Sequence, residues 1–141
     1  MVEKNLKLVI DTNILISATI SKQTRNYLDK IISEEQIEIY FSKELHREYE
    51  EVKTRRKIAK YLNPASEKYS KLIFDTFHLI EIKEKNKIIV RDEKDDYILS
   101  LALTCDADYI LTGDEDLLVL EKISKIKILT IREFMDKFYP V

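Results

Sequence analysis

The chain has 141 residues, of which 45% are hydrophobic and 35% charged, and its formal net charge is −2. This length suits one domain with a single core, and the composition excludes a disordered chain. The near-neutral charge excludes a basic field over the whole surface, so nucleic-acid binding would need local patches or metal ions. The sequence has no bilayer-length apolar run, no signal-like start and only one cysteine, so we expect a cytoplasmic protein with no membrane partner and no disulfide.

The first half of the chain alternates between strand and helix patterns. Residues 6–10 (LKLVI) form a β-branched run typical of a buried strand, and residues 24–35 have apolar side chains at helical spacing. A second strand is expected over residues 37–41, followed by a helix over residues 43–60 for which Ser42 is a suitable N-cap. Pro64 marks a break before another helix over residues 65–80.

The second half continues this alternation. Residues 86–90 fit either a short strand or an extended entry, and residues 95–107 predict a helix with one buried side. Further strands are expected over residues 108–112 and 126–131, with a helical turn within residues 114–123 and a last helix over residues 132–139. This order predicts an α/β fold: one domain over residues 1–141, with a mostly parallel sheet covered by helices on both faces.

Two acidic residues follow directly after predicted strands. Asp11 comes after the strand at residues 6–10, and Asp114 comes after the strand at residues 108–112. Gly113 is expected to free the backbone for a sharp turn between that strand and Asp114. Because sites in open parallel sheets form beyond the carboxyl ends of the strands, we expect both carboxylates at one edge of the sheet.

Two further acids fall on the buried sides of predicted helices. Glu48 shares a helical face with Leu45 and Val52, which point towards the core. Asp95 stands at the head of the apolar stripe of its helix, in the first turn. An acid on the apolar side of a helix needs a partner, so both residues are candidates for the same site.

Each acid also has an ordinary structural interpretation. Asp11 fits a turn residue, Asp95 an N-cap, Asp114 a turn or cap residue, and Glu48 a surface group on a differently rotated helix. Four convergent carboxylates, however, would repel one another unless a cation joined them. Oxygen ligands of this type suit Mg²⁺ or Mn²⁺, whereas the two histidines and one cysteine show no zinc-ligand spacing.

Four segments of the chain resemble the PIN-domain family, in particular the group related to VapC ribonucleases, the toxins of type II toxin–antitoxin systems. The segments are VIDTNILIS, SKELHREYEEV, RDEKDDYILSLALTCDADYILTGDEDLL and ILTIREF, and the resemblance extends from about Leu6 to Phe134. It implies a PIN-like three-layer α/β/α sandwich. Matched position by position, the four family acids are Asp11, Glu48, Asp95 and Asp114.

The resemblance also assigns supporting positions around these acids. Asn13 and Thr112 match polar positions beside the site. Asp116 matches a further acid two residues beyond the fourth, and Asp96 is the alternative to Asp95 as the third.

The function implied by the resemblance is endonucleolytic hydrolysis of single-stranded RNA with Mg²⁺ or Mn²⁺ as cofactor. It also implies a cognate antitoxin as partner and a homodimer. The alternative is a non-catalytic PIN-fold module that binds RNA or protein, against which the complete acid set argues.

Contacts with RNA need residues outside the acid set. Arg55 and Arg56, in the segment KTRRK, are candidates for phosphate contacts, although a solvated helix end is an equally good interpretation. Tyr61 and Tyr69 are expected to pack against the protein rather than stack on bases. His78 is expected to be a packed core residue.

Overall fold

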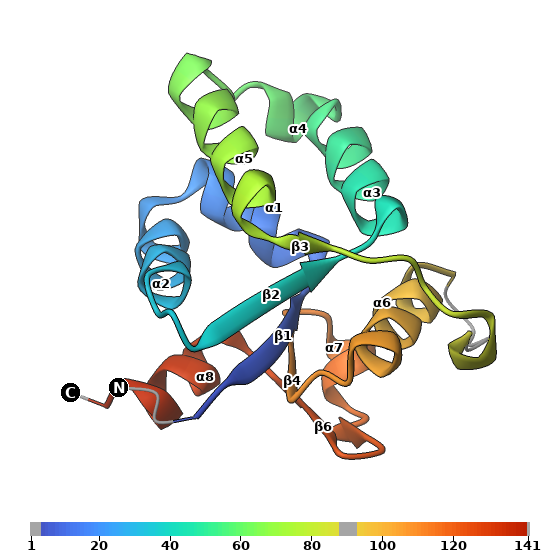
Figure 1. Ribbon diagram of the computed structural model, residues 1–141. Helices are drawn as coiled ribbons and strands as arrows, with labels where there is room; N and C mark the ends of the chain where they lie inside the picture. The colour runs from blue at the N-terminus through green and yellow to red at the C-terminus, as the bar shows by residue number, and fades with distance from the viewer. Residues whose placement is uncertain (1–3, 88–92, 141) are drawn as a thin grey trace.

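A computed structural model describes residues 4–87 and 93–140, which contain one six-stranded sheet (Figure 1). The strand order is β3-β2-β1-β4-β6-β5, and all neighbouring pairs are parallel except the β5–β6 pair. The strands are β1 (Leu6–Ile10), β2 (Ile37–Phe41), β3 (His78–Leu79), β4 (Tyr109–Leu111), β5 (Lys122–Ile123) and β6 (Ile126–Leu129).

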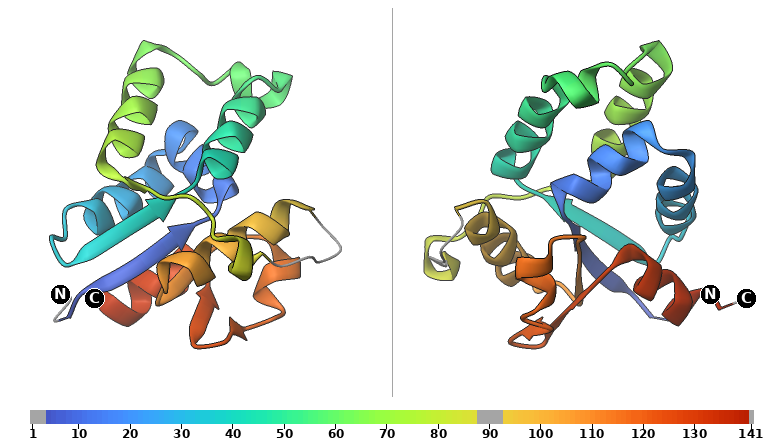
Figure 2. Two further views of the ribbon diagram at one scale, coloured as in Figure 1. Left: turned by 45° about the vertical axis from the view of Figure 1, so that its right-hand side comes forward. Right: turned by 180° about the vertical axis from the view of Figure 1, so that it is seen from behind.

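Helices cover both faces of this sheet, with α1, α2 and α8 on one side and α6 on the other (Figures 1 and 2). The expected mostly parallel α/β/α arrangement is therefore confirmed. The helices are α1 (Thr12–Ile20), α2 (Lys22–Ile32), α3 (Lys43–Lys53), α4 (Arg56–Ala59), α5 (Pro64–Thr76), α6 (Glu93–Cys105), α7 (Glu115–Leu118) and α8 (Ile131–Phe138), with a 3₁₀ turn, η1, at Glu84–Asn86. Within the described ranges, no helix has the length and apolar character needed to cross a bilayer.

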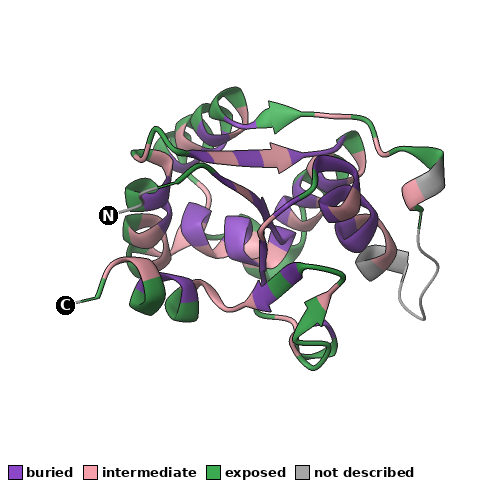
Figure 3. Cartoon of the chain, turned by 60° about the horizontal axis from the view of Figure 1, so that its bottom comes forward, coloured by how far each residue is buried: buried purple, intermediate pink, exposed green. Residues whose placement is uncertain are grey.

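The core lies around the two central strands (Figure 3). Leu8, Val9 and Ile10 of β1 are all buried, as are the three residues of β4. Burial on both faces explains why these strands read as continuous apolar runs rather than as alternating ones. The pairing of Ile10 with Leu111 places the carboxyl ends of β1 and β4 side by side.

The helix α1 was not predicted from the sequence. Six of its nine residues are buried, because it runs between the sheet and the helices α2, α3 and α5. A helix that is buried on most sides, with its few polar residues spread around it, has no amphipathic period, so the usual helical signal is absent. Residues 12–20 therefore carried no pattern from which a helix could be predicted.

Two other expectations were wrong in detail. The helix expected over residues 43–60 is divided into α3 and α4, and the helix expected over residues 65–80 ends at Thr76. The chain then forms the edge strand β3, so the side chain of His78 is 52% exposed rather than packed in the core. The segment expected over residues 86–90 extends beyond the described residues.

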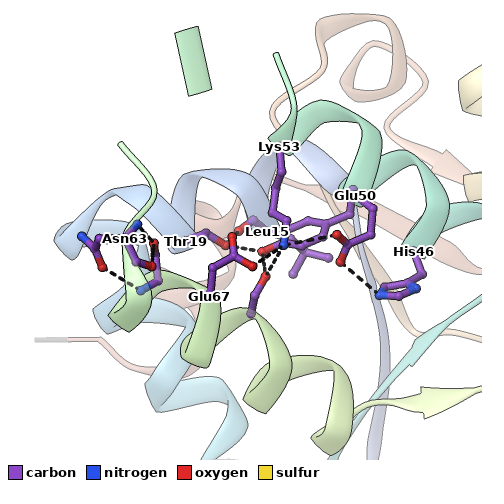
Figure 4. Close-up of polar contacts among 10 residues, drawn as sticks. Leu15, Thr19, His46, Glu50, Lys53, Asn63 and Glu67 are labelled. Carbon is purple, nitrogen blue, oxygen red and sulfur yellow. Dashed lines mark hydrogen bonds and ion pairs between the residues drawn. The ribbon is translucent and has the colours of Figure 1, made fainter. Parts of the chain in front are cut away.

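A polar network joins α1, α3 and α5 (Figure 4). The buried Tyr49 hydroxyl of α3 bonds with Thr19 of α1 at 2.6 Å and with Ser70 of α5. Burial raises the pKa of Tyr49, so this hydroxyl keeps its proton. The network holds α3 at one rotation about its axis relative to α1.

The buried Lys53 ammonium extends this network. Its Nζ lies 3.2 Å from Glu67 and 3.3 Å from Glu50. Partial burial opposes protonation, but the hydrogen bonds with these two carboxylates prevail and raise the pKa of Lys53. Lys53 therefore stays charged and ties the end of α3 to α5.

Replacing Tyr49 with Phe is expected to destabilise the protein by about 1–2 kcal/mol, because buried hydroxyls lose a partner. Lys53→Met is expected to cost less, up to about 1 kcal/mol, because Glu50 and Glu67 are about half exposed and stay hydrated when their cation is lost. Chemical denaturation measures both effects. The matched control is Lys71→Met, which removes an exposed pair with Asp75 and is expected to change stability by less than about 0.5 kcal/mol. A control effect as large as those of the two variants would contradict this account.

The Cys105 thiol is expected to be unreactive in the folded protein. Cys105 is buried at the end of α6, and burial raises the pKa of its thiol to about 12. Because the thiolate is the reactive form, a disulfide reagent at about pH 8 should label the protein only after unfolding. Labelling in buffer as fast as in concentrated guanidinium chloride would show that the thiol is accessible.

Candidate active site at the carboxyl edge of the sheet

Asp11 occupies the end of β1, where the chain turns into α1. Its backbone N–H donates to the Leu111 carbonyl at 2.9 Å, and its side chain is fully buried. Although Asp11 holds the N-cap position of α1, its carboxylate makes no capping hydrogen bond. Instead, Oδ2 accepts a hydrogen bond from the Thr112 hydroxyl at 2.7 Å. Capping of α1 therefore does not account for this carboxylate.

Thr112 connects Asp11 to Asp114. Its hydroxyl donates to Asp11 and accepts from the backbone N–H of Asp114 at 3.0 Å. Thr112 is itself fixed beyond β4, because its N–H donates to the Leu129 carbonyl of β6 at 2.9 Å. The two acids expected at one edge of the sheet are thus linked through one buried hydroxyl.

Asp114 also behaves as an ordinary cap residue. Its Oδ1 accepts a hydrogen bond from the Asp116 N–H at 2.9 Å, which caps the short helix α7. The side chain of Asp116 itself is exposed. The cap interpretation of Asp114 is therefore confirmed, and its backbone N–H ties this half-buried residue to Thr112.

Glu48 comes to the same edge from α3. Ser42 caps this helix by accepting from the Leu45 N–H at 3.2 Å, and Leu45 and Tyr49 are buried. With this rotation, Oε2 of the half-buried Glu48 accepts a hydrogen bond from the Thr12 hydroxyl at 3.4 Å. Glu48 thus lies against the first turn of α1 and is not a surface group.

The supporting residue Asn13 faces the loop that contains Gly113. A Cβ placed on Gly113 would lie 3.8 Å from Nδ2 of Asn13, which is an ordinary van der Waals contact. The φ angle of Gly113 is not positive, so this turn does not require glycine. The prediction that Gly113 frees the backbone for a sharp turn was wrong. The other side-chain atom, Oδ1 of Asn13, is buried and has no hydrogen-bond partner among the described residues.

The third acid belongs to the first turn of α6, which packs against β1 and α3. The side chain of Asp95 lies outside the described part of the structure. That of Asp96 is half-buried. The choice between Asp95 and Asp96 therefore stays a prediction.

The donor set at this edge fits a hard divalent cation. Carboxylates from Asp11, Glu48 and Asp114 and the buried amide oxygen of Asn13 are the oxygen ligands that Mg²⁺ and Mn²⁺ prefer. Among the described side chains, which do not include Asp95, no three acidic, histidine or cysteine residues form a ready metal site. To complete a metal site, an acid from the first turn of α6 or small movements of these side chains would thus be needed.

Sequence reasoning assigned no role to two residues that organise this site. Thr12 adjoins Asp11 and bonds with Glu48. Its place between Asp11 and Asn13 in the sequence could have indicated this role. Tyr49 fixes α3 through its hydroxyl, but a tyrosine on an apolar helix face reads simply as core. Of the two predicted RNA contacts, the exposed Arg55 is ion-paired with Glu51 at 2.9 Å, while Arg56 is exposed on α4.

Comparisons with known proteins agree with this geometry. A family model described as PIN domain matches residues 7–116. The chain is 32% identical, over 94% of its length and 92% of the relative's, to the uncharacterized protein MJ1680 of Methanocaldococcus jannaschii. Its fold is similar to a solved structure of VapBC2 from Rickettsia felis bound to a DNA fragment from their promoter. The TM-score is 0.59 and the sequence identity is 17%, and the match covers 87% of this chain and 97% of the chain in that structure. The chain therefore belongs to the PIN-domain family.

Proposed function

We propose that this protein is a metal-dependent endoribonuclease that hydrolyses phosphodiester bonds in single-stranded RNA. The observation that carries the proposal is the fully buried Asp11 carboxylate, which is oriented by Thr112 rather than used as a cap. A carboxylate fixed in this way lies at the carboxyl ends of parallel strands, where sites form in open α/β sheets. Glu48 and Asp114 approach the same edge from other elements, which supports this interpretation.

In this proposal, Asp11, Glu48, Asp114 and Asp95 or Asp96 would hold one or two Mg²⁺ or Mn²⁺ ions. A bound ion supplies an activated water and polarises the scissile phosphate. The Thr112 hydroxyl holds Oδ2 of Asp11, which leaves the orientation of the carboxylate fixed before any ligand arrives. Asn13 offers a buried amide oxygen on the same helix turn.

We further propose that the protein acts with a cognate antitoxin and forms a homodimer. The similar structure from Rickettsia felis is an assembly named VapBC2, which supports a protein partner for a chain of this fold. Symmetric pairing is the commonest state for soluble oligomers. The alternative, a PIN-fold binding module without catalysis, is distinguished by whether RNA is cut when metal is present.

The first test replaces Asp11 with Asn, which keeps the shape of the side chain but removes its charge. We expect metal-dependent cleavage of a labelled single-stranded RNA to fall to the level seen with chelator, because the central ligand is lost. The control is Asp136→Asn, an exposed acid on α8, which should cleave like the parent. Full activity in the folded Asp11→Asn variant would refute the proposal.

The second test concerns the orientation of Asp11. Thr112→Val removes the hydroxyl that binds Oδ2, and loss of such a supporting hydrogen bond is expected to reduce metal affinity or activity by about 10–100-fold. Thr112→Ser keeps the hydroxyl and should retain most of the activity. Equal Mn²⁺ affinity and cleavage rate in the Val variant and the parent would remove Thr112 from the site.

A further inference from the structure

The helices α3 and α5 are joined by α4, which lies at the end of α3 that is remote from the sheet (Figures 1 and 2). Arg56 and Lys57 belong to α4, and Lys60 follows it directly; all three side chains are exposed. Within the described residues, none of the three forms an ion pair, in contrast to Arg55 with Glu51. The α4 segment therefore presents uncompensated positive charge, although the chain as a whole is slightly acidic.

An exposed aromatic ring follows these cations. Tyr61 is 55% exposed, and it is the aromatic member of the exposed large hydrophobic residues in the described part of the chain. Nζ of Lys60 lies 5.2 Å from its ring centroid. Tyr61 is thus a partly covered surface ring, whereas Tyr69 packs more closely, with its hydroxyl donating to Asp29 at 2.8 Å.

Tyr61 forms one wall of a cavity of about 270 Å³ between the end of α1, α2 and the start of α5. This volume is just below the roughly 300–1,000 Å³ of sites for drug-sized ligands, which suits a single planar ring. Arg25 is held in the wall by hydrogen bonds from Nε to the Ala18 carbonyl at 3.0 Å and from Nη2 to the Thr19 carbonyl at 3.1 Å. Its charge forms no ion pair with a described residue.

The cavity and the acidic edge lie at opposite ends of α1. Asp11 precedes the first turn of this helix, and Thr19 and Ile20 of its last turn line the cavity. A rise of 1.5 Å per residue separates the two ends by about 13 Å. One strand of nucleic acid can therefore span both places.

We propose that Tyr61 and the adjacent cavity, with Lys57 and Lys60, bind the single-stranded RNA substrate a few nucleotides away from the bond that is cut. A base stacks on the Tyr61 ring beside the cavity, and the two ammonium groups contact the flanking phosphates. Exposed aromatics interleaved with cations bind single strands in this way, whereas an acidic peptide would use the cations alone. The inference rests on the proposed function for the identity of the substrate class.

Binding is measured with chelator present, so that cleavage does not enter. The probe is a fluorescent oligouridylate of about 12 nucleotides, followed by anisotropy over a series of salt concentrations. Tyr61→Ala is expected to weaken binding by about 5- to 100-fold, the effect of losing one stacked base, while Tyr61→Phe retains binding. With an abasic strand of the same length, Tyr61→Ala should make no difference.

The cations are tested by the salt dependence of the same binding. The double variant Lys57→Gln/Lys60→Gln is expected to lower the slope of log affinity against log salt by about 1.4, since each phosphate contact contributes about 0.7. The matched control, Lys125→Gln/Lys127→Gln, makes the same charge change on exposed lysines of the β5–β6 hairpin and should leave the slope unchanged.

Three results would overturn the inference: no oligouridylate binding by the parent, parent-like binding by Tyr61→Ala, or equal slopes for the two double variants. None of them decides whether RNA is cut. Metal-dependent cleavage is a separate readout, so the inference can fail while the proposed nuclease function stands. If the parent protein binds RNA through Tyr61 but does not cut it in the presence of metal, the proposed nuclease function is refuted and the proposed binding surface stands.

Discussion

The hydrogen bond from Thr112 to Asp11 joins residues 101 positions apart, and the geometry of the candidate site depends on it. A fully buried carboxylate needs such a donor, because its desolvation would otherwise destabilise the fold. The bond is possible only because β1 and β4 are parallel neighbours whose carboxyl ends lie together. The sheet order therefore determines which two loops can form a site, and Asp114 is positioned through the same hydroxyl.

The position of Glu48 depends on the next residue of its helix, Tyr49. On one side of α3 its carboxylate meets Thr12, and on the next residue the Tyr49 hydroxyl bonds with α1 and α5. Because successive residues of a helix point about 100° apart, fixing Tyr49 also fixes the direction of Glu48. Tyr49 therefore orients the helix, and the adjacent Glu48 contributes a carboxylate to the candidate site. Lys53 ties the end of the same helix to α5 through Glu67.

The sequence predicted β1, β2, β4 and β6 and the position of Asp11 and Asp114 at one edge of the sheet, because β-branched runs and the carboxyl-end rule depend on local pattern and topology, but it missed the two-residue edge strands β3 and β5. It also placed Glu48 correctly from the spacing of Leu45 and Val52. It failed for α1, which is buried on most sides, and for His78, whose exposure depends on where α5 ends. Such tertiary details have no period in the sequence, and the third acid remains a prediction on either Asp95 or Asp96.

The most direct measurement is the anomalous diffraction of a crystal of the unmodified protein soaked in Mn²⁺. The account predicts a manganese peak in contact with the Asp11 carboxylate, with further oxygen ligands from Glu48, Asp114 or the first turn of α6. Absence of a peak at Asp11 at saturating Mn²⁺, with the carboxylate still bonded to Thr112, would contradict a metal role for this edge of the sheet.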